Sequence, residues 1–207
     1  MEFYDIEQQA RLEQEASSSI FFNYHDITKD DMSNGEGLRV VLWFAGCSHR
    51  CPGCHNPETW SPQSGIPFTA WDESELFEAL SKDYIQGITF SGGDPLFRSN
   101  RSAFVTLLKK IKKKFPDKDV WVYTGYTLTK RDGTWMFEDT CPWLKEHDQF
   151  KPDFLEMVDV IVDGPFYKEI RENDLKLKTD PHWCGSSNQR VINVKETLRT
   201  GNIVIGG

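Results

Sequence analysis

The sequence predicts an α/β fold, an incomplete and open-sided (β/α) barrel of about five to six units. Short apolar runs without strict alternation are typical of strands buried on both faces, and helical patterns separate these runs along the chain. Alternating strands and helices build right-handed βα units around a parallel sheet. A complete barrel of eight units takes at least ~200 residues and typically ~250. The chain has 207 residues, and an irregular stretch at 127–152 uses some of them, so we expect one open side.

The predicted strands follow an N-terminal extension. Residues 1–20 are polar and acidic, and we expect them to form an appended helix ahead of a single domain at 21–207. The first strand is expected near Phe21, and "SNGEG" at 33–37 indicates a turn into the next strand. The nearly continuous apolar runs are expected as buried strands at 40–44, 88–90, 120–123 and 160–162.

Two helices are predicted between these strands. Thr69 and Asp72 have the spacing of a capping box, which predicts a helix from this point to about Lys82. Apolar residues at helical spacing within 104–115 predict the second helix, and Pro116 ends it. Both predicted helices connect consecutive buried strands, as βα units require.

The composition indicates a globular protein of the cytoplasm. The net charge of −8 argues against a broad nucleic-acid surface, and the lysines within 109–114 fall on the expected exposed face of the second helix. No apolar run approaches the ~18 residues of a membrane span, and the acidic N-terminus differs from a signal peptide. We therefore expect neither nucleic acid nor membrane as a partner. In a reducing compartment the five cysteines are free thiols or metal ligands.

Glycine follows every one of the four buried strands. The glycines are Gly46, the pair at 92–93, Gly125 and Gly164, each with polar neighbours. A single glycine of this kind is explained by the turn between strand and helix. In a parallel barrel, however, the carboxyl ends of all strands meet at one mouth, where the chemistry takes place. Four such turns in succession therefore predict a shared site.

The first of these turns carries three cysteines. Cys47, Cys51 and Cys54 have the spacing C-x3-C-x2-C. A structural zinc ion needs four ligands, so a histidine would have to complete the set. His49 and His55 lie in the loop, whereas His25, His147 and His182 could reach it only through folding, and Cys141 and Cys184 stand alone. The other option is a [4Fe–4S] cluster with three thiolate ligands, whose fourth iron stays open for a substrate.

The motif and its position resemble the signature of the radical S-adenosylmethionine (radical SAM) superfamily. "SGGDP" at 91–95 ends the next strand and is similar to the GGE-type motif of that superfamily. Within it, the chain closely resembles the family of activating proteins of anaerobic (class III) ribonucleoside-triphosphate reductase. The blocks that carry this resemblance over residues 23–192 are "SNGEGLR", "GCSHRCPGCHNPETW", "SGGDPL", "WVYTGYTL", "VDVIVDG" and "GSSNQRVI".

The chain departs from this family at several places. The N-terminal extension and the segment 127–152 are longer than in compact members. His55 takes the place of a tyrosine, and Gly53 that of an aromatic residue that many radical SAM enzymes place before their last cysteine. Stacking of adenine against this loop would therefore fall to His55.

The resemblance implies a cofactor and a set of site residues. The three cysteines would hold a [4Fe–4S] cluster, and the amino and carboxylate groups of S-adenosyl-L-methionine (SAM) would chelate the fourth iron. The backbone of the glycine pair and the Asp94 carboxylate would receive the ammonium group, although Asp94 also suits a helix cap. The "NQR" side chains would lie near the adenine or would lock the fold. The implied SAM-binding residues are Gly53, Cys54, His55, Ser91, Gly92, Gly93, Asp94, Thr124, Gly125, Asn188, Gln189 and Arg190.

The resemblance also implies a reaction. An electron donor such as flavodoxin or ferredoxin would reduce the cluster, which would cleave SAM to methionine and a 5′-deoxyadenosyl radical. That radical would take a hydrogen atom from a glycine of the reductase large subunit, which forms the glycyl radical. An open-sided barrel suits a protein loop as substrate. Two alternatives stay open: another small radical SAM enzyme (a different glycyl-radical activase or a deazapurine synthase), and a non-catalytic zinc-binding module.

Overall fold

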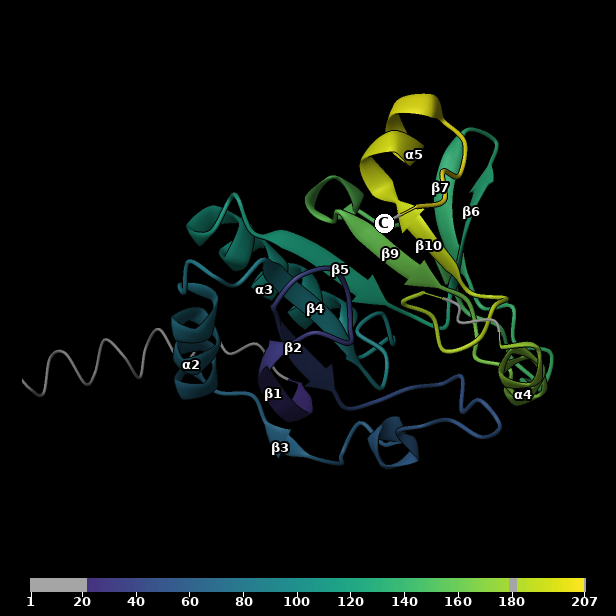
Figure 1. Ribbon diagram of the computed structural model, residues 1–207, viewed down its shortest axis with the longest axis horizontal. Helices are drawn as coiled ribbons and strands as arrows, with labels where there is room; N and C mark the ends of the chain where they lie inside the picture. Colours follow the sequence, from purple (N-terminus) through teal and green to yellow (C-terminus); the bar gives the residue numbers. More distant parts are fainter. Residues whose placement is uncertain (1–21, 179–181, 207) are drawn as a thin grey trace, which may run out of the picture.

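The structure is a computed structural model that describes residues 22–178 and 182–206 (Figure 1). It consists of a seven-stranded mixed sheet, a small three-stranded sheet and four α-helices within this range. The expected helix at 1–20 lies outside the described residues, and the division into an extension and a single domain stays a prediction. Among the described residues, no helix combines the length and the apolar character that crossing a membrane requires.

The large sheet has the strand order β10-β9-β5-β4-β2-β1-β3. Four neighbouring strands in its interior run parallel and correspond to the four apolar runs, so that prediction is confirmed. The outer strands pair antiparallel, with β1 and β3 at one edge and β10 at the other. The parallel strands are β2 (Arg39–Phe44), β4 (Gly87–Gly92), β5 (Asp119–Tyr123) and β9 (Val160–Asp163); the antiparallel ones are β1 (Asn23–Asp31), β3 (Ile66–Pro67) and β10 (Arg190–Asn193).

The predicted α/β class is confirmed, but the number of βα units was too high. Four parallel strands make three crossovers, and only the first two contain an α-helix. The sheet is open, because its edge strands β3 and β10 are not neighbours, and closure toward a barrel is not confirmed. The helices are α2 (Ala70–Leu80), α3 (Arg101–Lys114), α4 (Lys168–Leu177) and α5 (Val194–Thr200), with short 3-10 helices η1 (Pro57–Trp60) and η2 (Leu155–Met157).

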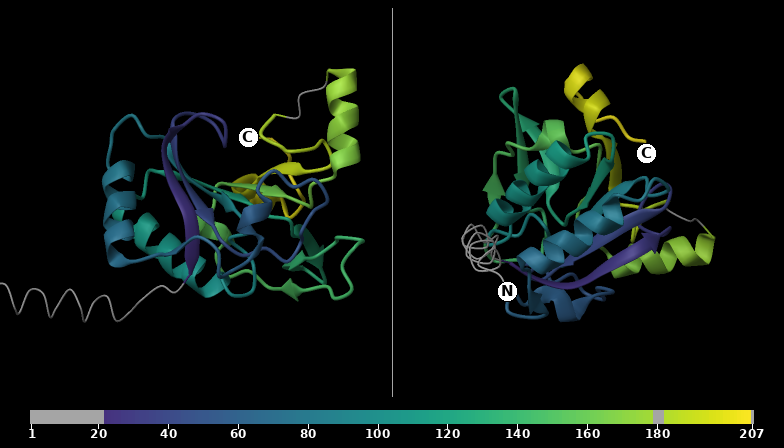
Figure 2. Two further views of the ribbon diagram at one scale, coloured as in Figure 1. Left: turned by 90° about the horizontal axis from the view of Figure 1, so that it is seen from below. Right: turned by 90° about the vertical axis from the view of Figure 1, so that its left-hand side faces the viewer.

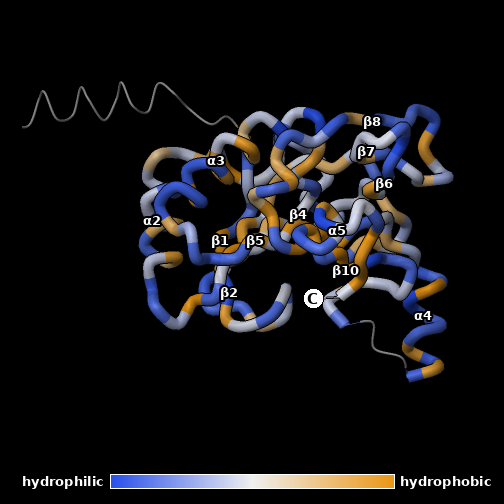
Figure 3. Tube along the Cα trace, turned by 90° about the horizontal axis from the view of Figure 1, so that it is seen from above, coloured by the Kyte–Doolittle hydropathy of each residue, from blue (hydrophilic) through white to orange (hydrophobic). Residues whose placement is uncertain are grey.

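Both predicted helices form where the sequence places them. The Asp72 carboxylate accepts hydrogen bonds from the backbone N–H of Thr69 at 2.7 Å and from its hydroxyl at 2.6 Å, which confirms the capping interaction. Helix α2 ends at Leu80, slightly before the expected Lys82. Helix α3 ends two residues before Pro116, and its apolar face is buried. The tube in Figure 3 shows apolar positions gathered along the central strands, which the helices cover.

The stretch 127–152 was expected to be irregular, but it forms the second sheet. Its strands are β6 (Thr127–Arg131), β7 (Thr134–Glu138) and β8 (Gln149–Phe150). Asp132 and Gly133 connect β6 to β7 with φ angles of 46° and 78°, which is the favoured geometry of a two-residue hairpin turn. Buried Leu128 and Phe137 anchor this sheet in the main core. It lies between β5 and β9 in the chain and replaces the third crossover helix.

The strand ends define the two sides of the large sheet. The amino ends of β2 and β4 are held by buried Arg39, whose guanidinium donates to Thr89 Oγ1 at 2.8 Å and forms an ion pair with Asp119. At the carboxyl ends, the connections after β2 and β4 are longer than those after β5 and β9. Helix α4 follows β9 and lies at the periphery, beyond β9 and β10, in the views of Figures 1 and 2.

The buried guanidinium generates a prediction about stability. Arg39→Met should lower the free energy of unfolding by about 2–4 kcal/mol, because it leaves the partly buried Asp119 carboxylate unpaired. Lys29→Met is the matched control, since it breaks an exposed pair with Glu75 and should cost less than about 1 kcal/mol. Urea unfolding of the cluster-free chain measures both. Equal losses in the two variants would show that Arg39 contributes no more than a surface charge.

Candidate active site

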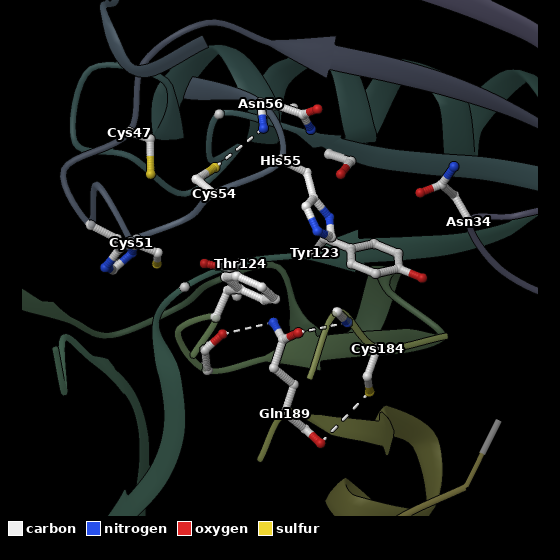
Figure 4. A pocket seen from close by; sticks show the side chains of 18 of the residues that line it. Asn34, Cys47, Cys51, Cys54, His55, Asn56, Tyr123, Thr124, Cys184 and Gln189 are labelled. Carbon is white, nitrogen blue, oxygen red and sulfur yellow. Dashed lines mark hydrogen bonds between the residues drawn. The ribbon is translucent and has the colours of Figure 1, made fainter. Parts of the chain in front are cut away.

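The carboxyl ends of the four parallel strands open into one cavity of about 800 Å³. Residues after β4, β5 and β9 line it, among them the glycine pair at 92–93, Gly125 and Gly164. Three of the four turns that the sequence places at a shared site therefore meet at one surface, and the cysteines after β2 form its other wall (Figure 4). The cavity volume lies within the range of small-molecule sites.

The cysteine loop is folded against the 3-10 helix that follows it. The backbone N–H of Gly46 donates to Thr59 O at 2.7 Å and that of Cys47 to Trp60 O at 3.0 Å. The N–H of Cys54 donates to Cys51 O at 3.0 Å and closes the loop. These bonds turn all three cysteines toward the cavity, and Figure 4 shows their sulfur atoms around a common space.

The three thiols suit a group larger than a single ion. Among the described residues, the one set of His, Cys, Asp and Glu side chains within reach of one ion is His49, Asp139 and Cys141, and the three loop sulfurs are not such a set. Trp60 Nε1 is buried without an oxygen or nitrogen partner and lies beside the Cys54 thiol. A donor in this position suits the sulfur atoms of an iron–sulfur cluster.

The pKa values of the thiols differ with their surroundings. Burial raises the pKa of Cys47 and that of Cys54 above the ordinary value for a thiol. The pKa of Cys51 is lowered to about 7, chiefly by a hydrogen bond from the Cys141 thiol. The sequence left the role of Cys141 open, and the structure places this residue at the back of the cysteine loop. No local sequence pattern predicts the contact between Cys51 and Cys141, because the two cysteines are 90 residues apart.

The glycine pair after β4 packs on the base of the cysteine loop. Gly92 has a φ of 102°, and a Cβ there would lie 2.5 Å from Phe44 N. A Cβ on Gly93 would lie 2.5 Å from Gly46 O. Only glycine fits at either position. The Gly93 N–H donates to Phe44 O at 2.7 Å, so the turn and the loop form one unit.

Asp94 is buried behind this wall and does not line the cavity. Its carboxylate accepts hydrogen bonds from Thr124 Oγ1 at 3.0 Å, from the Gly125 N–H at 2.9 Å and from the Leu96 N–H at 2.8 Å. Thr124 and Gly125 do line the cavity. Asp94 thus joins the end of β4 to the end of β5. Asp94 also caps the local turn that leads to Leu96. It is not the cap of helix α3, because the N-cap residue of that helix is Asn100.

Only one of the three "NQR" side chains faces the cavity. Gln189 lines it, and its amide donates to Gly164 O at 2.9 Å (Figure 4). Asn188 donates to Pro165 O at 2.7 Å, and Arg190 pairs with buried Asp163. These bonds join the loop after β9 to the start of β10. The sequence left two interpretations open for these side chains, contact with the adenine or a network that locks the fold. The contacts of Asn188 and Arg190 are those of a network that locks the fold.

The remaining wall is aromatic. His55 lines the cavity with its ring 5.1 Å from that of Phe166, whereas Gly53 faces the Lys168 side chain instead. Tyr123 and Trp183 also line it, and the Tyr123 hydroxyl donates to Trp183 O at 2.9 Å. Neither Tyr123 nor Trp183 was expected at the site from the sequence. Tyr123 could have been found, because it ends a predicted buried strand beside "TG".

Comparison with known proteins agrees with this geometry. The model of the family described as "4Fe-4S single cluster domain" matches residues 33–192. The chain is 41% identical over 169 residues to the anaerobic ribonucleoside-triphosphate reductase-activating protein of Enterobacteria phage T4, which covers 82% of this chain and 92% of the relative. The protein of the same name from Escherichia coli K12 is 36% identical over 171 residues, or 82% of this chain and 97% of the relative. This chain therefore belongs to the family of anaerobic ribonucleoside-triphosphate reductase-activating proteins.

Proposed function

We propose that this protein is a radical SAM activase that forms the glycyl radical of an anaerobic ribonucleotide reductase. The observation that carries the proposal is the shared cavity, in which three thiols of a C-x3-C-x2-C loop face the glycine turn of a neighbouring parallel strand. The names of the relatives support the choice of reductase. When bound, the cluster and SAM supply the one-electron cleavage of SAM and the abstraction of a hydrogen atom from the target glycine.

Cys47, Cys51 and Cys54 would hold the [4Fe–4S] cluster. Their sulfurs are too widely spaced for one ion, and three ligands leave one iron free for SAM. The loop is stiffened by backbone hydrogen bonds to η1, so the ligands are held in place before the cluster binds. Preorganised ligands lower the cost of binding.

The turn after β4 would hold the methionyl part of SAM through backbone groups. Ser91, Gly92 and Gly93 line the cavity, and glycine lets the ligand approach the chain closely. Asp94 would keep this turn in register with Thr124 and act without touching the ligand. On the opposite wall, Gly125 would face the ribose, and His55 with Phe166 would bracket the adenine.

The open sheet suits a substrate that is part of another protein. We take its curvature to be that of an incomplete barrel, with the cavity mouth exposed between the carboxyl ends of the strands. A glycine-bearing loop of the reductase would enter there. The electron donor would be a small redox protein of the flavodoxin or ferredoxin class, and the cytoplasmic location stays a prediction.

Cluster assembly and SAM cleavage test the proposed chemistry. After anaerobic reconstitution with iron and sulfide, the wild type should yield 5′-deoxyadenosine from SAM and dithionite, and Cys51→Ala should yield none, because it lacks a ligand. Cys184→Ala is the control for iron content, since this residue lies outside the loop and should leave the iron bound per chain unchanged. Wild-type protein that takes up zinc, builds no cluster and leaves SAM intact would favour the zinc-binding module.

Asp94→Asn tests the proposed indirect role of this carboxylate. The amide presents a donor to groups that already donate, so the end of β5 should shift and the Kd for SAM, measured on cluster-loaded protein, should rise about tenfold. Asp159→Asn is the control, because this carboxylate accepts the Val120 N–H at the other end of β5. Anaerobic calorimetric titration measures both values. Equal affinities in the two variants would contradict the assigned role.

The choice of target separates this function from that of another activase. Incubated with SAM, a reductant and its anaerobic ribonucleotide reductase, the protein should produce a glycyl radical signal in the electron paramagnetic resonance (EPR) spectrum of the reductase. A second glycyl radical enzyme, such as a formate lyase, should stay silent under the same conditions. A signal in the second enzyme alone would assign the activase to a different target.

A further inference from the structure

His49 lies inside the cysteine loop, yet its ring is buried. Only 1% of the side chain is exposed, whereas the next residue, Arg50, is exposed. The ring lies between two buried carboxylates. Nε2 is 3.0 Å from Asp94 Oδ2, and Nδ1 is 3.5 Å from Asp139 Oδ1. Burial alone would lower the pKa of this histidine, but hydrogen bonds and charges of Asp139 and Asp94 raise it to about 10.

The segment 139–143, between β7 and β8, holds both the ring and the backbone of His49. Cys141 Sγ lies 3.3 Å from Nδ1, and Trp143 Nε1 donates to His49 O at 2.6 Å. Asp139 in turn accepts the backbone N–H of Cys141 at 2.9 Å, which fixes the segment itself. Three side chains of the segment between β7 and β8 therefore meet one residue of the cysteine loop.

The opposite face of the ring is equally confined. A Cβ on Gly125 would lie 2.3 Å from His49 Cδ2, so the ring occupies the space that a side chain at this position would need. The ring of Tyr126 contacts it edge-on, with centroids 4.6 Å apart. His49 is thus enclosed by the end of β5, by the turn after β4 and by the segment 139–143.

We propose that His49 is a positioning residue that clasps the cysteine loop to Asp94 on one side and to Asp139 on the other, and so fixes the orientation of the cluster ligands. The inference rests on the proposed function, because it treats Cys47 and Cys51 as ligands. His49 stands between these two cysteines, so a shift of its ring moves both. The segment that holds Asp139 also carries Cys141, whose thiol lies beside that of Cys51.

Two physical arguments support this role. Partners beyond the ligands orient them, and their loss typically costs 10–100-fold in metal affinity. The buried ring also has a carboxylate beside each nitrogen, Asp94 beside Nε2 and Asp139 beside Nδ1, and the Cys141 thiol is a second neighbour of Nδ1. The clasp thus transmits the position of the small sheet to the cysteine loop, although no residue of that sheet reaches the cavity.

Removal of the link at either end tests the proposal. His49→Gln and Asp139→Asn should each release the cluster to an iron chelator about tenfold faster than the wild type, with SAM absent. The double variant should be no faster than His49→Gln alone, because both changes break one connection. His25→Gln is the matched control, since this histidine lies outside the cysteine loop and makes a single side-chain hydrogen bond, to Ser64. Its rate should equal that of the wild type.

A second readout separates positioning from a general loss of stability. The EPR spectrum of the reduced cluster, recorded without SAM, should change in His49→Gln and in Asp139→Asn but not in the control. Release at the wild-type rate in both variants overturns the proposal, and so do additive effects in the double variant. A bound metal ion that Asp139→Asn removes in addition to the cluster iron also overturns it, because His49, Asp139 and Cys141 would then be metal ligands.

The outcome is independent of the proposed activity. If His49→Gln does not fold, Asp139→Asn still tests the link, because it keeps the histidine and nearly the same volume. A wild-type chain that binds a cluster without cleaving SAM refutes the proposed function, while the release rates still decide the clasp. Conversely, unchanged release rates in an active enzyme refute the clasp alone.

Discussion

The contact between the turn after β4 and the base of the cysteine loop supports the rest of the site. The two backbones approach so closely that a single methyl group at Gly92 or Gly93 would collide with main-chain atoms. Because the turn and the loop end neighbouring parallel strands, β2 and β4, this contact holds the cysteines beside the proposed SAM wall. Asp94 and His49 then extend the same unit to β5 and to the small sheet. The site is therefore built mainly from backbone geometry, with few functional side chains.

The sequence predicts the central fold well, because the relevant signals are local. The apolar runs that became β2, β4, β5 and β9 are buried on both faces, and their short length and the glycine after each distinguish them from buried helices. The stretch 127–152 was misjudged because its strands are short and half-exposed. The hairpin signal "RDGT" was nevertheless present in the sequence, with Leu128 and Phe137 as the buried anchors on either side.

The candidate site was predictable where spacing alone defines it. The three cysteines and the glycine pair belong to short motifs, and the structure places them around one cavity. The directions of Asp94, Asn188 and Arg190 were not predictable, since a polar residue beside a motif can face a ligand or lock the backbone equally well. The contact of Cys141 with the loop depends on how the small sheet folds back. Only the tertiary structure contains that information.

The clasp around His49 also sets an order of events during synthesis. Its contacts join residues that are 92 and 94 positions apart in the chain, and translation delivers the N-terminal partner first. A nascent chain exposes the cysteine loop long before Trp143 has left the ribosome. Iron that arrives in this interval meets a cysteine loop that still lacks its contacts with the segment 139–143. Completion of the small sheet is thus the step after which the growing protein can keep its metal.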